Sequence, residues 1–384
     1  MSYSGFSDDV RDNIAGADFY PAIVDDVPIA EHSGNTDIED LETIDGAEES
    51  QFTTFGDVPD ISIEEIVQSK VSKKIRDLRE FLSDGTLITE KSNQTTNLIN
   101  VSEKKTYCLP DTKVEEFFTI LDDCRREKRM LHYSERQETS LQSHSGIMID
   151  FDRYQKSKDP EITEKHFSTL VGRICKILFD IIDPTEHADA TGQIYFHVFI
   201  IRKPEVVAMP IKNPKDTPIY KDGFHILIPD VQIMKGAKKY LLDEIINRGI
   251  MKAVFRDIPH MEEPEKMLDK MSASNPVHFL GNSKPGKPAY NLVLAYEFSI
   301  YAGDDEFSRV DLNVKDLLEG KNPNGGDINL TYETSLSFSL LQFAGKPVWL
   351  SKRQFKCKQA LETKLQLLVE KTAGGLIQEN DLAG

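Results

Sequence analysis

The sequence predicts an α+β fold, and three observations support this class. Apolar residues recur at helical spacing in some segments and alternate with polar residues in others. These two patterns interleave along the chain without the regular repeat of a βαβ protein. The chain has 384 residues, of which 39% are hydrophobic, so it is long enough to bury one or two cores. We therefore expect helices packed against a sheet.

Residues 1–60 are expected to form a disordered acidic tail. They contain sixteen acidic residues and one basic residue, Arg11, and so carry a charge of -15 out of -18 for the chain. Such a segment buries too little apolar surface to offset the entropy of ordering. It could bind a partner, repel non-specific DNA or only aid solubility. The rest of the chain is nearly neutral, so the acidic total does not exclude a nucleic-acid partner.

The cysteines and the apolar runs indicate the compartment. Cys108, Cys124, Cys175 and Cys357 lie far apart and form no zinc or disulfide pattern, so we expect free thiols in a reducing compartment. No apolar run approaches the roughly 20 residues that a membrane-spanning helix requires. The first residues do not have the pattern of a signal peptide, so we expect none. We expect a soluble, intracellular protein without a membrane partner.

Two helices are expected before the first long strand. The first spans 62–82, where Ser62 and Glu65 form a capping-box pattern ahead of apolar residues at helical spacing. The second spans about 114–129 and ends in the basic run 125–129. Such a run is usually a solvated helix end, but it could also contact a template strand.

From Gly146 the apolar pattern changes from helical spacing to alternation, which predicts a strand over 147–152. The later elements follow from the same two patterns. We expect strands at 194–201, 224–228 and about 289–300, and helices at about 166–182, 235–247 and 351–370.

The strand at 147–152 carries two acidic residues, Asp150 and Asp152. Residues i and i+2 of a strand face the same side, so the two carboxylates point together, while Ile149 and Phe151 face the core. Two close carboxylates repel each other unless a cation lies between them. Oxygen ligands of this kind suit Mg²⁺ or Mn²⁺ in a two-metal phosphoryl-transfer site. In isolation, the pattern is equally typical of a solvated strand end.

Two further segments carry groups that could bind phosphate. His225 lies in an apolar strand; such a histidine is usually a core residue, but here it could donate to a nucleotide's phosphates, with Lys221 as a nearby charge. The segment from Gly281 to Lys287 imitates a P-loop but lacks its Ser/Thr and the helix that must follow, so we reject that function. Ser283 and Lys284 in this loop could still cradle phosphates.

Taken in order, these blocks resemble the archaeo-eukaryotic primase superfamily, whose members carry a D-x-D motif, a small-x-His motif and a hydrophobic-Asp motif. The corresponding blocks are 146–152, 223–229 and 267–269, followed by 281–285. The sequence is most similar to the N-terminal primase part of the primase–helicase proteins of nucleocytoplasmic large DNA viruses. The resemblance runs from about residue 66 to 345.

The resemblance implies a role for each matching residue. Asp150, Asp152 and Asp269 would bind Mg²⁺ or Mn²⁺, and His225 and Lys284 would contact the triphosphate of the incoming nucleotide. The chain departs from the family in having Gly223 where many relatives have serine, which removes a hydroxyl. The third carboxylate also has rivals close by, namely Asp257, Glu262, Glu263 and Glu265.

The resemblance also implies a domain plan and a function. An RRM-like core with an N-terminal α/β unit would form a catalytic domain over 61–345, and a helical linker over 346–384 would lead to a helicase region. Such a protein makes primers on single-stranded DNA from NTPs or dNTPs during DNA replication, in the host cytoplasm or at a viral replication site. The alternatives are a metal-dependent nuclease with the same carboxylates, and a non-catalytic nucleic-acid-binding scaffold for a helicase.

Overall fold

The computed structural model describes residue 78 and residues 80–83, 97–137, 142–210, 217–301, 306–338 and 349–365. All of these belong to one compact unit, Ile61–Gly384. The tail expected over 1–60 lies outside the described residues. So does most of the helix expected over 62–82, of which residues 78 and 80–82 are described and are helical. Residues 366–384 also lie outside them.

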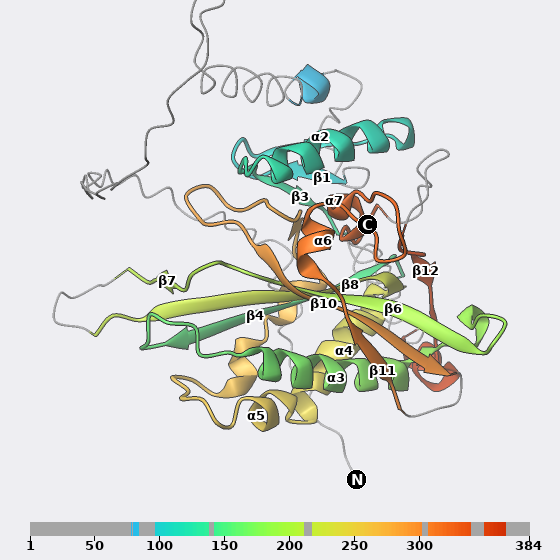
Figure 1. The fold of residues 1–384 in the computed structure, drawn as a ribbon. Coiled ribbons are helices and arrows are strands. Elements are labelled where there is room, and N and C mark those ends of the chain that lie inside the picture. The colour runs from blue at the N-terminus through green and yellow to red at the C-terminus, as the bar shows by residue number, and fades with distance from the viewer. Residues whose placement is uncertain are drawn as a thin grey trace, which may run out of the picture. The chain divides into compact units, whose positions relative to one another are not determined.

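A seven-stranded sheet forms the centre of this unit (Figure 1). Its strands are β4 (His144–Gln155), β6 (Gln193–Arg202), β7 (Val207–Ala208), β8 (Tyr220–Met234), β10 (Asn291–Tyr301), β11 (Ser308–Asp311) and β12 (Arg353–Gln354). They follow the order β11-β10-β6-β8-β12, and β4 and β7 also pair with β8. The pairing of β12 with β8 is parallel, and the other pairings are antiparallel.

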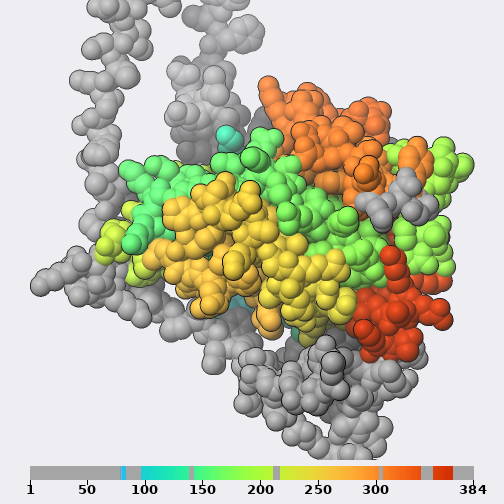
Figure 2. Space-filling model, turned by 90° about the horizontal axis from the view of Figure 1, so that it is seen from below, coloured from blue at the N-terminus to red at the C-terminus, as the bar shows by residue number. Residues whose placement is uncertain are grey.

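The order of these elements confirms the α+β class. Helix α3 (Glu164–Ile181) connects β4 to β6, and β8 lies between these two strands and pairs with both. This is a split βαβ unit, the arrangement expected of an RRM-like core. Helices α4 (Lys235–Asn247) and α5 (Ile250–Val254) follow β8. They lie with α3 on one side of the sheet, as Figure 1 shows, and Figure 2 views the molecule from that side.

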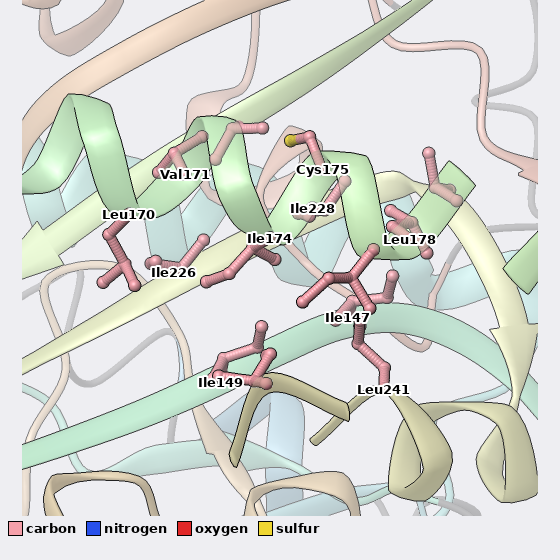
Figure 3. Packing of buried hydrophobic residues seen from close by; sticks show 14 of the residues in the cluster. Ile147, Ile149, Leu170, Val171, Ile174, Cys175, Leu178, Ile226, Ile228 and Leu241 are labelled. Atoms are coloured by element: carbon pink, nitrogen blue, oxygen red, sulfur yellow. The ribbon is translucent and has the colours of Figure 1, made fainter. Parts of the chain in front are cut away.

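The main hydrophobic core lies between the sheet and these helices (Figure 3). Alternate residues of a strand point to the same face, so Ile147 and Ile149 of β4 and Ile226 and Ile228 of β8 all face the helices. Each of the four is at most 1% exposed. Helix α3 meets them with apolar residues at helical spacing, Leu170, Val171, Ile174, Cys175 and Leu178. The opposite face of the sheet therefore carries the intervening polar residues of β4 and β8.

A smaller sheet and one long helix form the expected N-terminal α/β unit. The sheet has the order β2-β1-β3-β9. Its strands are β1 (Leu98–Asn100), β2 (Lys105–Tyr107), β3 (Tyr133–Glu135) and β9 (Val277–His278), and the helix is α2 (Val114–Arg126). Phe117 and Phe118 of α2 are fully buried against Phe279. Because β9 comes from much later in the chain, this unit is not a separate N-terminal segment.

Short elements complete the described fold. They are the helices α6 (Val314–Leu318) and α7 (Leu330–Glu333), the strands β5 (Ile182–Asp183) and β13 (Lys356–Cys357), and the 3-10 helices η1 (Asp111–Lys113), η2 (Thr185–His187), η3 (Pro264–Met267) and η4 (Lys270–Ala273). Helices α6 and α7 contribute Leu317 and Leu330 to a second core on the other face of the sheet, against Phe199 and Leu227.

The structure corrects two expected helix boundaries. Helix α2 ends at Arg126 and not, as expected, at about residue 129. Two residues after this end, Lys128 adopts a positive φ of 55°. The helix expected over 351–370 begins only at Gln359, because the residues before it form β12 and β13. Phe355, between these strands, is 1% exposed in the main core. This part of the expected linker is therefore packed into the domain.

The basic run at the end of α2 also has a structural role. Asp122 accepts hydrogen bonds from Nε of Arg125 at 2.7 Å and from Nε of Arg126 at 2.8 Å. The two guanidinium groups also donate to backbone carbonyls, including those of Leu318 and Ile328. Both arginines attach α2 to the segment around α6. The side chain of Arg125 is only 7% exposed and so is not a solvated helix end, whereas that of Arg126 is 41% exposed, and a template contact of this run stays a prediction.

The four cysteines are free thiols, as expected. Within the described ranges, no helix is both long enough and apolar enough to cross a membrane.

Candidate active site

Asp150 and Asp152 lie on the face of the sheet opposite to α3 and α4. Strand β4 pairs with β8 in a register that places Asp150 opposite His225 and Asp152 opposite Gly223. The intervening Phe151 is fully buried in the main core, so both carboxylates point to the other side. The register therefore brings the D-x-D motif and the histidine motif side by side.

Each of the two carboxylates has a basic partner. Nε2 of His225 lies 3.2 Å from Oδ1 of Asp150, and Nζ of Lys221 lies 2.7 Å from Oδ2 of Asp152. Burial alone raises the pKa of Asp150, but the charges of His225, Lys221 and Lys203 outweigh burial and hold it below its ordinary value. Asp150 is therefore ionised at neutral pH.

Two buried atoms at this point have no hydrogen-bond partner among the described residues. They are Oδ1 of Asp150 and Nδ1 of His225. Nε2 of His225 faces this Oδ1 at 3.2 Å as an ion-pair partner. A buried polar atom without a partner costs about 1–3 kcal/mol. Such atoms are typical of a site where a ligand supplies the missing partner.

Asp269, the expected third carboxylate, is attached to this pair through the backbone. Its N–H donates to the carbonyl oxygen of Asp150 at 2.9 Å. Its carboxylate accepts hydrogen bonds from the N–H of Met271 at 2.8 Å and from Nδ2 of Asn275 at 3.0 Å. Burial raises the pKa of Asp269, and the negative charges of Asp150 and Asp152 raise it further.

The rival carboxylates have other surroundings. Asp257 lies 2.9 Å from Nε2 of His166, a residue of α3, which is on the opposite side of the sheet from the D-x-D motif. Glu262 lines a small cavity beside Asp152. Glu263 precedes the 3-10 helix η3, and Glu265 lies within it. In the described part of the chain, Asp269 is the acidic residue of this set whose backbone bonds to Asp150.

The carboxylates can be tested for their fit to a divalent metal. Within the described residues, no three side chains of His, Cys, Asp or Glu converge as a ready metal-binding group. The donors nevertheless have the right chemistry, because Mg²⁺ and Mn²⁺ prefer carboxylate oxygens and water. Asp150 offers an oxygen without a hydrogen bond. Asp150 and Asp152 thus fit such an ion, and Asp269 would join after leaving Met271 and Asn275.

Three lysines bring positive charge to the same face. Burial lowers the pKa of Lys203, and Lys221 and Lys284 lower it further, while Asp152 and Asp150 act in the opposite direction. Lys221 is paired with Asp152, Lys203 lies over the ring of Tyr290, and Lys284 is close enough to lower the pKa of Lys203. A cluster of this kind is suited to the phosphates of a nucleotide.

Tyr290 forms one wall of the site. Its ring lies 4.1 Å from that of His225 at an angle of 31°, and Nζ of Lys203 lies 5.2 Å from its ring centroid. Burial, together with the charges of Asp150 and Asp152, raises the pKa of Tyr290, so its hydroxyl stays protonated and can donate. A Cβ at Gly223 would lie 3.4 Å from this hydroxyl. The hydroxyl of Tyr290 thus lies close to the position that the hydroxyl of a serine would take in place of Gly223.

The hydroxyl of Ser283 is bonded within its own loop. The residue is 2% exposed, and its Oγ donates to the carbonyl oxygen of Lys287 at 2.8 Å and to that of Lys284 at 3.1 Å. Its N–H donates to Leu131. The serine therefore shapes the loop that carries Lys284. As expected for a segment that is not a P-loop, this loop is followed by a strand, β10.

Sequence reasoning assigned no role to Lys203 or Tyr290. Lys203 follows the last residue of β6, and Tyr290 precedes the first residue of β10. Because β6 and β10 are neighbours in the sheet, both residues leave it at the edge where β4 carries the carboxylates. In the sequence, these two residues could have been recognised only as polar residues at the ends of strands that lie near β8 in the sheet. Recognising them requires the strand order, which periodicity alone does not reveal.

Comparisons with known proteins identify the family of this chain. The model of the family described as the C962R protein N-terminal AEP domain matches residues 96–296, just over half of the chain. The chain therefore belongs to this family of viral archaeo-eukaryotic primase-like domains. The matched range contains all seven site residues expected from the sequence.

Its relatives include proteins of African swine fever virus that are named "Putative primase C962R". The protein of the Tick/Malawi isolate is 27% identical over 248 residues, which are 64% of this chain and 24% of that protein. The protein of the Badajoz strain is 28% identical over 242 residues, 63% of this chain and 22% of that protein. The chain thus spans about a quarter of the length of the curated relatives it matches.

Proposed function

We propose that this chain contains the catalytic domain of a DNA primase-polymerase, which joins NTPs or dNTPs on a single-stranded DNA template. One observation carries the proposal. Asp150 and Asp152 lie on one sheet face directly against His225 and Lys221, within the range that matches the primase-like family. Carboxylates beside a lysine and histidine cluster suit a reaction that needs both metal ions and bound triphosphate.

The proposal gives each group a task. Lys203, Lys221 and Lys284 bind and neutralise the triphosphate, and His225 donates a hydrogen bond to it. Asp150 and Asp152, with Asp269, would hold Mg²⁺ or Mn²⁺, and this ion would supply activation of the attacking 3′-hydroxyl and stabilisation of the charge on the phosphates. Ser283 acts indirectly, by shaping the loop of Lys284. No protein side chain has to act as the general base.

A helicase, linked or associated, is part of this proposal as a partner. A nuclease would use the same carboxylates, but it would cut DNA in the absence of nucleoside triphosphates. A non-catalytic scaffold has no use for paired carboxylates, which repel a phosphate backbone.

The direct test is primer synthesis on an unprimed single-stranded template, with labelled NTPs or dNTPs and with Mg²⁺ or Mn²⁺. We expect short labelled products that require both the template and the metal. A protein that makes no product and also fails to extend a preformed primer would contradict the proposal. Template cleavage without nucleotides would favour the nuclease.

Replacing His225 by alanine is expected to weaken nucleotide binding by about tenfold or more and to leave template binding nearly unchanged. The reason is that a hydrogen bond to a charged group contributes about 1.5–3 kcal/mol. Nucleotide affinity and oligonucleotide affinity are measured separately, with His144→Ala at the far end of β4 as a control. Equal losses of both affinities, with a lower Tm, would instead identify a core histidine.

Although many relatives carry serine here, replacing Gly223 by alanine in this chain is expected to reduce primer synthesis by about threefold, because small displacements of catalytic groups are costly. The added Cβ would lie 3.0 Å from Oδ1 of Asp152 and must displace that carboxylate. Gly172→Ala is the matched control, since a Cβ there meets nothing within 4 Å. Steady-state rates of both variants would be compared, and equal rates would contradict this role of Gly223.

A further inference from the structure

A second cavity lies at the other end of the sheet from the carboxylate pair. Strand β8 pairs with β6 only as far as the pair Phe199–Leu227, and then leaves it. A cavity of about 360 Å³ opens near this point. Its lining includes Tyr195, His197, Asp230, Glu297, Trp349 and Arg353. This volume is typical of a small-molecule site.

The charges in this cavity compensate each other. His197 donates from its backbone N–H to Asp230 at 2.9 Å, and its Nδ1 lies 2.8 Å from the same carboxylate. Its Nε2 lies 3.3 Å from Glu297. Burial lowers the pKa of His197, but the bonds to Asp230 and Glu297 outweigh it and raise this pKa to about 9. The imidazolium thus lies between two carboxylates.

Arg353 supplies the second positive charge. Its guanidinium donates to the carbonyl oxygens of His187 at 2.8 Å and of Tyr195 at 2.9 Å. Two carboxylates and two cations therefore cancel, and the cavity favours neither an anion such as phosphate nor a simple cation. An uncharged ligand with hydrogen-bonding edges fits better.

The aromatic residues that line the cavity favour a flat ligand. The ring of Trp349 lies 4.8 Å from that of His197, and Tyr195 is 38% exposed. Aromatic side chains of this kind stack on nucleobases. Glu297 is partly exposed and contacts His197 through Oε2, so its other oxygen remains for the amino group of a base. We propose that this cavity binds a nucleobase.

This site is separate from the candidate active site. Ile201 of β6 is the cross-strand neighbour of His225. His197 lies four residues further along the same strand, which corresponds to about 13 Å. The inference therefore goes beyond the proposed function and relies on it only for the choice of single-stranded DNA as a probe. The base could belong to a strand or to a free nucleotide.

The test uses intrinsic fluorescence, because Trp349 is the only tryptophan of the 384 residues. The full chain is titrated with a 12-mer oligonucleotide, an abasic 12-mer and free nucleotides. We expect saturable quenching by a ligand that carries bases and none by the abasic strand. Saturation by the 12-mer alone assigns the base to a strand, and saturation by free nucleotides assigns it to a nucleotide. No quenching, or equal quenching by the abasic strand, would overturn the proposal.

Variants separate this cavity from the active site. Tyr195→Ala and Glu297→Gln are expected to lower the affinity for the titrated ligand by about tenfold. Tyr301→Ala, at an exposed tyrosine, is the matched control and is expected to leave this affinity unchanged. Asp150→Asn combined with Asp152→Asn should leave the quenching curve unchanged even if primer synthesis is lost. Affinity measured by anisotropy of a labelled oligonucleotide provides a second readout. Unchanged affinity in Tyr195→Ala, with the fold intact by circular dichroism, would refute the site.

Discussion

Primer synthesis is expected to fall by about a thousandfold or more when Asp150 and Asp152 are both replaced by asparagine. A loss of this size corresponds to about 4 kcal/mol of transition-state stabilisation. Asparagine keeps the shape of each side chain but removes the charge that would hold a divalent ion. Because Asp150 and Asp152 pair with His225 and Lys221, and these positive charges hold the pKa of Asp150 below its ordinary value, neutralising both carboxylates should lower the Tm slightly. Incorporation of labelled nucleotide and Mn²⁺ binding would be measured together.

The same measurements decide the third carboxylate. Asp269→Asn is expected to lower both activity and metal affinity, because Asp269 is bonded to the backbone of Asp150. Glu262→Gln and Asp257→Asn serve as matched controls that should retain activity. A double variant of Asp150 and Asp152 that still makes primers would refute the metal-binding role of the pair. Activity loss in Glu262→Gln but not in Asp269→Asn would assign the third metal-binding carboxylate to Glu262 in place of Asp269.

A large effect on stability is expected at Asp122. Replacing Asp122 by alanine should lower the free energy of unfolding by about 3–5 kcal/mol, because it leaves a buried charge without its partner. The side chain of Arg125 is only 7% exposed and is bonded to this carboxylate. Thr331 of α7 also donates to Asp122, through Oγ1 at 2.8 Å. The measurement is urea unfolding at neutral pH.

Glu116→Ala is the matched control for this variant. Glu116 lies on the same helix and pairs with Lys113 at 2.8 Å, but both side chains are exposed. Exposed pairs contribute about 0–1 kcal/mol, so this variant should unfold almost like the wild type. Equal destabilisation by both substitutions would contradict the importance of burial at Asp122.

The contribution of Asp122 should also depend on pH. Burial raises its pKa, but the hydrogen bonds and charges of Arg125 and Arg126 outweigh burial, so the pKa is lowered from 3.8. A carboxylate with a lowered pKa stabilises the fold fully above its unfolded value and loses this effect as pH falls through the folded value. The difference between wild type and Asp122→Ala should therefore persist at pH 5 and shrink only below about pH 3.8.

Much of the fold could be predicted because periodicity reports which side chains are buried. Ile147, Ile149 and Phe151 alternate with polar residues, and this alternation alone predicted a strand with both aspartates on one face. Helix α4 occupies the expected residues, Lys235–Asn247. The segment around Phe355 was wrongly predicted as helix, because its strands are only two residues long and are stabilised by pairing with distant parts of the chain.

The site was harder to predict because it depends on contacts between distant segments. The motifs predicted that Asp150 and His225 serve one site, but the register that places them side by side comes from the β4–β8 pairing. Lys203 and Tyr290 lie outside any motif and meet only when β6 and β10 become neighbours. From the sequence, the basic run at Arg125 looked available to a template strand, but the charge of Arg125 is paired with Asp122 inside the fold.

The pairing of β12 with β8 has a practical consequence for expressing shorter versions of this protein. The family match ends at residue 296, which lies inside β10. A fragment cut there would lose residues 297–301 of that strand, the parallel partner of Val231 and Gln232, and the buried Phe355. Gene fragments intended for crystallisation or assays should therefore extend beyond Leu361, which is itself only 8% exposed in the main core.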